Sequence, residues 1–420
     1  MKKRTSVALV GIGGYGQIYV SPLIDPAQAE PHGAQLVAAV DPNPAACKHL
    51  PALQAGDVPI YPATADLYAH HRPDVVVIAS PIQFHARQTI EALSHGAHVL
   101  CEKPLCGSVE QARDMRLAQE RSGRQVAIGY QWSFSEAIGR LKADIMAGAF
   151  GAPRRCKSLA LWPRDEVYYT RNGWAGRLMT RSGEPVLDSP INNACAHFLH
   201  NLLYLLGTRV DRSAAPVTVQ AELYRAHTIE TFDTAALRCR LAGDVELLFV
   251  VSHATAELRE PAFVLEFDRA TITYGGEKGG RLIARYQDGT ERDYGRPSGS
   301  SDANKLWTSI ESFNANTPVV CGVEAATPQT LVVCAAHASM PEPVVFPPSL
   351  IHVSGDVGKR KTFVDGLGAV LTDCYDQRLL PSELRADWAR RGSTVRVADL
   401  VSSTHPAPGV QPPEVAYVPA

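Results

Sequence analysis

The chain has 420 residues, of which 45% are apolar and 20% charged, and a formal net charge of −2. This length exceeds what one hydrophobic core organises efficiently, so we expect two domains. The near-neutral balance, with a pI of about 6.7, argues against a general binder of nucleic acid or acidic lipid and favours small polar partners. The nine cysteines include no C-x-x-C pair, and no apolar stretch approaches the ~20 residues of a membrane span. We therefore expect a reduced, cytoplasmic protein without a metal site.

The first part of the chain alternates strand and helix signals at short intervals. The continuous β-branched run 75–78 is typical of a strand buried on both faces of a parallel sheet. Gly96 and Gly123 stand where helices end, and Ser108 with Gln111 forms a capping box. We expect strands at 6–10, 35–40, 74–79 and 97–100, and helices at 15–23, 85–95 and 108–122. Residues 1–128 are thus predicted to form a doubly wound α/β domain.

After residue 129 the pattern changes to long strand-like runs separated by turns, which predicts a second α/β domain with an open, mostly antiparallel sheet. Strands are expected at 217–224, 235–241, 245–252, 262–267 and 270–274, and helices at 134–147, 191–206, 327–340, 363–375 and 381–390. Thr327 with Pro328 is interpreted as the start of the third of these helices. We assign residues 129–400 to this domain and 401–420 to a tail. By analogy with other open sheets, an exposed sheet face favours a homo-oligomer.

A glycine-rich motif lies at the first strand–helix junction, Gly11-Ile12-Gly13-Gly14-Tyr15-Gly16, and fits G-x-G-x-x-G. Such glycines permit a tight turn, a close approach of the backbone to a pyrophosphate, and close helix–strand packing, which indicates a Rossmann dinucleotide site. Asp41 ends the next strand, where a carboxylate binds ribose hydroxyls and repels a 2′-phosphate, so NAD is favoured over NADP. A glycine turn without a ligand and a helix-capping aspartate are the alternatives.

Two further segments carry a family resemblance. Residues 78–85, Ile-Ala-Ser-Pro-Ile-Gln-Phe-His, and 98–105, His-Val-Leu-Cys-Glu-Lys-Pro-Leu, resemble the glucose–fructose oxidoreductase, inositol dehydrogenase and rhizopine-catabolism family over roughly residues 7–341. The resemblance implies that Lys103 lies beside the nicotinamide and touches the reacting hydroxyl. It also implies that Ser80, Pro81, His85 and Glu102 line the cofactor. We add Gln131 to these cofactor residues. Independently, a lysine buried beside a cationic ring has a lowered pKa and can exchange protons near neutrality. A surface lysine in a turn is the alternative.

The expected helix 191–206 carries an uncharged polar stripe on an otherwise apolar surface, which indicates a polar pocket rather than bulk water. The stripe contains Asn193, His197, His200, Asn201 and Tyr204. Family members usually have Asp-x-x-x-His here, so the resemblance makes His197 a substrate-binding histidine and puts Asn193 in the aspartate position. Asparagine cannot take a proton, so any relay depends on Lys103 and His197.

Asp188 could replace the missing carboxylate, although Pro190 places it ahead of the helix. For His197 a structural role in the core is the alternative, and for His200 it is the better interpretation.

An aromatic and basic segment between a strand and this helix suits a carbohydrate, because aromatic faces stack on sugar C–H surfaces. Anchoring of a long loop is the alternative role for these residues, and His253 is a weaker candidate. The predicted substrate residues are Trp162, Arg164, Tyr168, Asn172 and Trp174.

These features favour an NAD-dependent oxidoreductase that oxidises a secondary alcohol of a sugar, glycoside or cyclitol, with Lys103 and His197 handling the proton. One alternative is an NAD-dependent glycosidase that works by transient oxidation and elimination without net redox change. Asn193 increases the weight of that alternative. The other is a non-catalytic regulator that senses dinucleotide. Retention of Lys103 and His197 argues against it.

Overall fold

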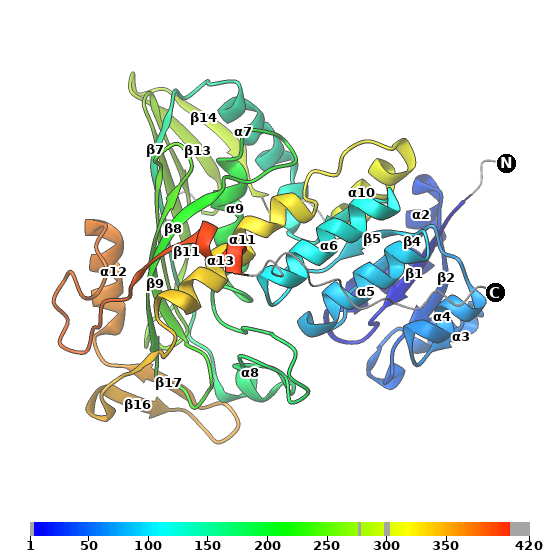
Figure 1. The fold of residues 1–420 in the computed structure, drawn as a ribbon, viewed down its shortest axis with the longest axis horizontal. Coiled ribbons are helices and arrows are strands. Elements are labelled where there is room, and N and C mark those ends of the chain that lie inside the picture. Colours follow the sequence, from blue (N-terminus) through cyan, green and yellow to red (C-terminus); the bar gives the residue numbers. More distant parts are fainter. Residues whose placement is uncertain (1–3, 276–278, 298–302, 404–420) are drawn as a thin grey trace.

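The structure is a computed structural model that describes residues 4–275, 279–297 and 303–403 (Figure 1). Its first domain is built on a parallel sheet with the strand order β3-β2-β1-β4-β5-β6. The strands are β1 (Thr5–Val10), β2 (Ala34–Val40), β3 (Ile60–Tyr61), β4 (Val75–Ile78), β5 (His98–Cys101) and β6 (Val126–Ile128). The helices are α1 (Gln17–Ile24), α2 (Pro26–Ala29), α3 (Leu50–Ala55), α4 (Thr64–His70), α5 (Ile82–Ser94) and α6 (Val109–Ser122). The predicted doubly wound fold is confirmed.

The order of the strands locates the ligand crevice. β1 pairs with both β2 and β4, so the chain reverses its direction of travel across the sheet at β1. In such sheets ligands bind outside the carboxyl ends of the strands at this point. The ends of β1, β2, β4 and β5 therefore position residues 11–16, 41, 79–81 and 102–104 around one crevice.

The second domain is a mixed sheet with the order β14-β13-β12-β11-β7-β10-β9-β8-β15. The predicted antiparallel character is confirmed, except that β7 pairs with β10, and β8 with β15, in parallel. The strands are β7 (Pro153–Leu161), β8 (Pro216–Arg225), β9 (Thr234–Leu241), β10 (Glu246–Ser252), β11 (Arg259–Phe267), β12 (Ala270–Tyr274), β13 (Leu282–Tyr286), β14 (Glu291–Gly295), β15 (Val344–Val345) and β18 (Thr394–Arg396). The inner face packs on α7 (Glu136–Met146), α9 (Ala196–Leu205) and α11 (Val323–Ser339).

The outer face of this sheet is covered over β7 to β10, where an exposed open face was expected. The hairpin of β16 (Ile351–Ser354) and β17 (Lys361–Val364) and the helix α12 (Leu367–Gln377) lie on the side opposite α9 and α11 (Figure 1). Their apolar side chains bury outward-facing residues of β7 to β10, including Leu159, Leu248 and Val250. The physical reason is that the chain continues past α11 and supplies its own cover.

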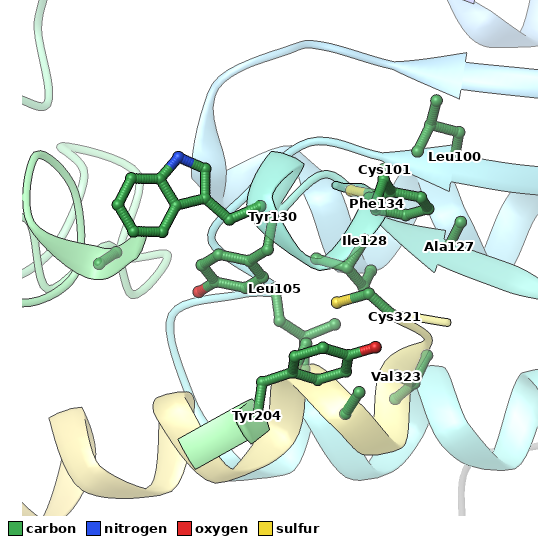
Figure 2. Packing of buried hydrophobic residues seen from close by; sticks show 14 of the residues in the cluster. Leu100, Cys101, Leu105, Ala127, Ile128, Tyr130, Phe134, Tyr204, Cys321 and Val323 are labelled. Atoms are coloured by element: carbon green, nitrogen blue, oxygen red, sulfur yellow. The ribbon is translucent and has the colours of Figure 1, made fainter. Parts of the chain in front are cut away.

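α10 (Asn304–Ala315) returns to the first domain, which the predicted boundary at residue 128 does not anticipate. His32 stacks on Trp307 with ring centroids 4.5 Å apart, and His98 stacks on Phe313 at 4.8 Å. The N–H of Ile128 donates to the carbonyl of Cys321 at 2.7 Å. Figure 2 shows this junction, where Ile128, Tyr130 and Cys321 pack together above α11. The two domains therefore share one continuous core.

Four predicted helices are corrected. The helix expected at 191–206 begins only at Ala196, because Asn193 uses its side chain to bond Asp188, in the way that asparagine competes with helical bonds. α11 begins at Val323, and Thr327 donates to the carbonyl of Val323 at 2.7 Å instead of capping a helix, so Pro328 lies inside it.

The helix expected at 381–390 is a series of turns, since the carboxylate of Glu383 is used by Arg238 and by the N–H of Leu380. The helix expected at 363–375 runs from Leu367 to Gln377, because residue 363 is paired in the β16–β17 hairpin.

At the end of the chain, α13 (Val397–Ser403) extends into the predicted tail, and residues 404–420 lie outside the described residues. Within the described residues, no helix has the length and apolar character needed to cross a membrane.

Candidate active site

A cavity of about 1110 Å³ lies at the crevice between the two domains. Its volume exceeds the ~300–1,000 Å³ of common small-molecule pockets, which leaves room for two ligands side by side. Most of the predicted cofactor residues and several predicted catalytic and substrate residues line it together. These are Gly11, Gly13, Gly14, Tyr15, Asp41, Ser80, Pro81, His85, Glu102, Lys103, Gln131, Asn172, Trp174, Asn193 and His197.

The glycine-rich turn has the backbone geometry that requires glycine. Gly11 has φ +85°, and a Cβ there would lie 2.9 Å from the carbonyl carbon of Ala79. A Cβ on Gly16 would lie 1.9 Å from the carbonyl oxygen of Gly11, so a side chain would separate the strand from the helix. The nearest atoms to a Cβ on Gly13 are side-chain atoms of Ala46 and Asp41, at 3.5 and 3.7 Å. The turn is therefore closed toward the protein and accessible from the cavity, as close approach of a pyrophosphate requires.

Asp41 holds this turn in place. Its Oδ2 accepts hydrogen bonds from the N–H groups of Ile12, at 2.9 Å, and Gly13, at 3.1 Å, while Oδ1 accepts from Asn43 at 2.8 Å. Ile12 is fully buried, so it shapes the turn without lining the cavity. Asp41 itself lines the cavity, where the remaining lone pairs of its carboxylate can accept hydroxyl donors.

His85 connects two segments of the cofactor half. Its Nδ1 lies 2.8 Å from the carbonyl of Pro104 and its Nε2 lies 2.9 Å from the carbonyl of Ser80. Burial lowers the pKa of His85. Gln131 accepts a hydrogen bond from the hydroxyl of Tyr15 at 3.3 Å. These contacts fix the β4–α5 turn against the segment that carries Lys103.

Lys103 lies where the two domains meet. Its Nζ lies 3.3 Å from the carbonyl oxygen and 3.4 Å from the Oδ1 of Asn193, which belongs to the second domain. Burial lowers the pKa of Lys103, the Glu102 carboxylate opposes this effect, and the nearby Lys305 ammonium adds to it. A lysine in such an environment can act as an acid or a base closer to neutrality than an exposed one.

Glu102 takes part in a buried ion pair that sequence reasoning missed. Its Oε1 lies 2.5 Å from the Nζ of Lys305, and the two side chains are 7% and 1% exposed. The same oxygen accepts a hydrogen bond from the hydroxyl of Tyr19, and Lys305 also donates to the hydroxyl of Tyr15 at 3.1 Å. A lone lysine beside Leu306 and Trp307 was the available signal in the sequence, but its partner lies about 200 residues away.

His197 lies in the first turn of α9 and reaches the cavity. Burial lowers its pKa well below the ordinary value, and the positive charges of Lys103 and Lys305 lower it further. The ring is therefore neutral at physiological pH and can donate or accept one hydrogen bond on each nitrogen. Its Nδ1 has no hydrogen-bond partner among the described residues.

His200 has a structural role in the core, which the sequence favoured over a role in the site. Its ring stacks on Tyr130 with centroids 3.8 Å apart, and its Nε2 lies 3.0 Å from the hydroxyl of Ser133. Burial lowers the pKa of His200 to about 3.

Asp188 supplies the carboxylate that Asn193 lacks. Its Oδ1 accepts from the Nδ2 of Asn193 at 2.8 Å, its Oδ2 accepts from the N–H of Gly176 at 2.6 Å, and Arg171 lies 4.0 Å from Oδ2. Burial raises the pKa of Asp188, while the hydrogen bonds and Arg171 oppose the rise. The amide of Asn193 thus bridges Asp188 and Lys103.

The predicted substrate residues separate into two groups. Asn172 and Trp174 line the cavity, together with Arg171 of the same aromatic and basic segment. Trp162, Arg164 and Tyr168 lie outside the lining and stack on one another, with the Arg164 guanidinium 5.3 Å from the Trp162 ring and 4.9 Å from the Tyr168 ring. The Nδ1 of His253 donates to the carbonyl of Trp162 at 2.8 Å and supports the same loop. Among the described residues, no cluster of histidine, cysteine and acidic side chains could hold a metal ion.

Comparison with known proteins identifies the first domain. Residues 5–130 match the model of an oxidoreductase family with an NAD-binding Rossmann fold. Over this domain, the resemblance to the glucose–fructose oxidoreductase, inositol dehydrogenase and rhizopine-catabolism family is confirmed.

Two curated relatives illustrate the match. Inositol 2-dehydrogenase of Rubrobacter xylanophilus is 33% identical over 158 residues, which are 36% of this chain and 42% of the relative. D-glucoside 3-dehydrogenase of Escherichia coli is 31% identical over 144 residues, 32% of this chain and 36% of the relative. The chain therefore spans less than half the length of the curated relatives that it matches.

Solved structures share the fold of both domains. The WlbA dehydrogenase of Chromobacterium violaceum, in complex with NADH and UDP-GlcNAcA, has a TM-score of 0.66 at 19% identity and covers 86% of this chain and 97% of its own. An oxidoreductase of Agrobacterium radiobacter, in complex with NAD+, L-tartaric acid and magnesium, has a TM-score of 0.65 at 18% identity, with 80% and 96% covered.

Proposed function

We propose that this protein is an NAD-dependent oxidoreductase that oxidises a secondary alcohol of a sugar, glycoside or cyclitol. The observation that carries the proposal is the meeting of Lys103 and Asn193, with Nζ and Oδ1 3.4 Å apart, beside His197 at the inner end of the glycine-lined cavity. The names of relatives with an inositol or a glucoside as substrate support this class of alcohol.

The residues of the first domain fit a bound NAD. The glycine turn would face the pyrophosphate, and Asp41, already fixed by three N–H donors, would accept the hydroxyls of the adenosine ribose. Its negative charge disfavours the 2′-phosphate of NADP. When bound, NAD supplies the acceptor for a hydride from the substrate.

Lys103 is the proposed proton acceptor for the substrate hydroxyl. Its lowered pKa makes the neutral amine accessible, and Asn193 orients the Nζ toward the cavity. Neutral His197 would hold a substrate hydroxyl by one hydrogen bond. Asn193 cannot take the proton, so Asp188 acts on Lys103 only through the bridging amide and its field.

A second candidate is the transient-oxidation glycosidase. Asn193 in place of the usual aspartate favours it, and 2,7-anhydro-N-acetylneuraminate hydratase of Mediterraneibacter gnavus matches this chain at 24% identity over 200 residues. We favour the dehydrogenase, because no residue in the cavity requires an elimination step.

One experiment separates the two candidates. The protein is incubated with aryl glycosides, free sugars and cyclitols and either stoichiometric or trace NAD, and NADH and phenol are measured together. The dehydrogenase should form one NADH per substrate consumed and stop when NAD is limiting. Lys103→Ala and His197→Ala should each lower turnover by about 10²- to 10⁴-fold while NAD still binds. Phenol release without NADH would favour the glycosidase, and full turnover by Lys103→Ala would contradict both.

A further inference from the structure

The segment that follows α11 is built onto the outer face of the second sheet by specific contacts. Arg238 of β9 donates to both carboxylate oxygens of Glu383, at 2.9 and 2.8 Å. Glu222 of β8 accepts from the N–H of Ser382 at 3.0 Å, and Lys157 of β7 donates to the carbonyl of Tyr375 at 2.9 Å. We call residues 347–391 the cap. Three strands of the sheet, β7, β8 and β9, therefore each hold the cap with a polar side chain in addition to the apolar packing.

The cap also reaches the loop that lines the outer half of the cavity. The N–H of Glu166, the first residue of α8 (Glu166–Thr170), donates to the carbonyl of Arg360 at 2.9 Å. The Oε1 of Glu166 accepts from the N–H of Gly358 and, at 3.4 Å, from the N–H of Arg360. Asp165 and Lys361 form an antiparallel bridge. The β16–β17 hairpin thus fixes the start of α8.

The other end of the loop is fixed by the catalytic side of the domain. The N–H of Gly176 donates to Asp188 at 2.6 Å, and the carbonyl of Gly176 accepts from Glu230 at 2.8 Å. Between these two anchors lie Arg171 and Trp174, whose guanidinium and ring are 5.2 Å apart. A loop held at both ends loses less conformational entropy on binding a ligand than a loop held at one end.

We propose that the cap, besides covering part of the sheet face, holds the substrate loop in place through Glu166. Glu166 is then a positioning residue for Arg171, Asn172 and Trp174. The inference rests on the proposed function only because it takes these three residues to bind the substrate. The solved structure from Agrobacterium radiobacter aligns over 96% of its own length but 80% of this chain, so this chain carries segments that it lacks.

The test compares Glu166→Ala with Glu166→Gln, which keeps an acceptor oxygen, in the full-length protein. Val167→Ala is the matched control, because Val167 is the next residue of α8 and is 49% exposed. Hydrogen exchange of residues 164–176 without substrate is the first measurement. We expect Glu166→Ala to speed exchange in this segment by about tenfold or more, Glu166→Gln to restore protection in large part, and Val167→Ala to leave it unchanged.

The second measurement is steady-state kinetics on the substrate found above, together with NAD binding. Glu166→Ala should raise KM for the substrate several-fold, change kcat less, and leave the Kd of NAD unchanged. Unchanged exchange in Glu166→Ala would overturn the anchoring. Faster exchange with unchanged KM would overturn the positioning role. If the native protein turned over no alcohol, the proposed function would fail, while the exchange result would still decide whether the cap holds the loop.

Discussion

The buried carboxylate of Glu102 pairs with the ammonium of Lys305, and both charges act on Lys103. Their charges act in opposite directions on the pKa of Lys103, since Glu102 raises it and Lys305 lowers it. Glu102 and Lys305 are buried, so water screens little of their effect on Lys103. The pKa of Lys103 is therefore adjusted in part by Lys305, which does not line the cavity.

This arrangement predicts opposite pH shifts for two variants. Alcohol oxidation needs neutral Lys103, so activity rises as pH rises through its pKa. Lys305→Met removes a positive neighbour, raises the pKa of Lys103, and should move the rising limb of kcat/KM to higher pH. Glu102→Gln removes the negative neighbour and should move it to lower pH. The measurement is the pH profile of kcat/KM, with thermal melts to check folding. Shifts in the same direction, or none, would contradict the role of the pair.

Asp41 predicts cofactor preference. Asp41→Ala removes the carboxylate that would accept the ribose hydroxyls. It also removes the acceptor for the N–H groups of Ile12 and Gly13, which holds the glycine turn in place. We expect it to weaken NAD binding by about 10- to 100-fold, the usual value of a hydrogen bond to a charged group, and to weaken NADP binding less. Titration calorimetry with both cofactors tests this. Equal affinity of the native protein for NAD and NADP would refute the argument.

At the scale of elements, the turn that precedes α9 decides the contacts of the proposed catalytic residues. Because the helix begins at Ala196, Asn193 projects from the turn, and its amide reaches Asp188 and Lys103. Among the described residues, no hydrogen bond joins the side chains of Asn193 and His197. A helix from residue 191, as the sequence suggested, would have placed Asn193 and His197 one turn apart on the same face.

Asn193→Asp should therefore act on Lys103. The new carboxylate would stand within about 3 Å of Asp188, so the two would share one proton, and it would lie closer to the Nζ of Lys103 than Asp188 does. We expect a raised pKa of Lys103 and a shift of the rising limb of kcat/KM to higher pH. The same pH profile measures it, with Asn193→Ala as the control without a carboxylate. A pH profile identical to that of the native protein would show that a charge at position 193 does not change the pKa of Lys103.

At the scale of the whole molecule, the cap changes which surfaces can bind another copy. The outer face over β7 to β10 is occupied by residues of the same chain, so a homo-oligomer would have to use the remaining part of this face or other surfaces. The homo-oligomer itself remains a prediction.

Excision of the cap tests its role as a cover. β15 and β18 both pair with β8, so a Gly/Ser linker of about six residues can replace residues 347–391. The exposed apolar face should then make the protein self-associate or precipitate, because large apolar patches are not stable in water. Light scattering after size-exclusion chromatography measures this, and retained NAD binding checks the first domain. A variant with the mass and solubility of the native protein would show that the cap is dispensable.

The sequence by itself determined the first domain and most of its cofactor site. Gly11, Gly16 and Asp41 act through local turns and adjacent strands, and local geometry of this kind is encoded within a few dozen residues. Helix ends were predictable for the same reason where one residue decides them. Ser108 caps α6 by accepting from the N–H of Gln111 at 3.2 Å, and Gly123 ends that helix with φ +64°.

Only the tertiary structure decided the contacts that join distant segments. The pairing of Glu102 with Lys305 spans 203 residues, and that of Glu166 with Gly358 spans 192. No periodicity or spacing encodes such a pair, because the two residues meet only after both domains and the cap have packed. The start of α9 and the position of Pro328 inside α11 were likewise decided by side-chain bonds and packing that outweigh intrinsic helix propensity.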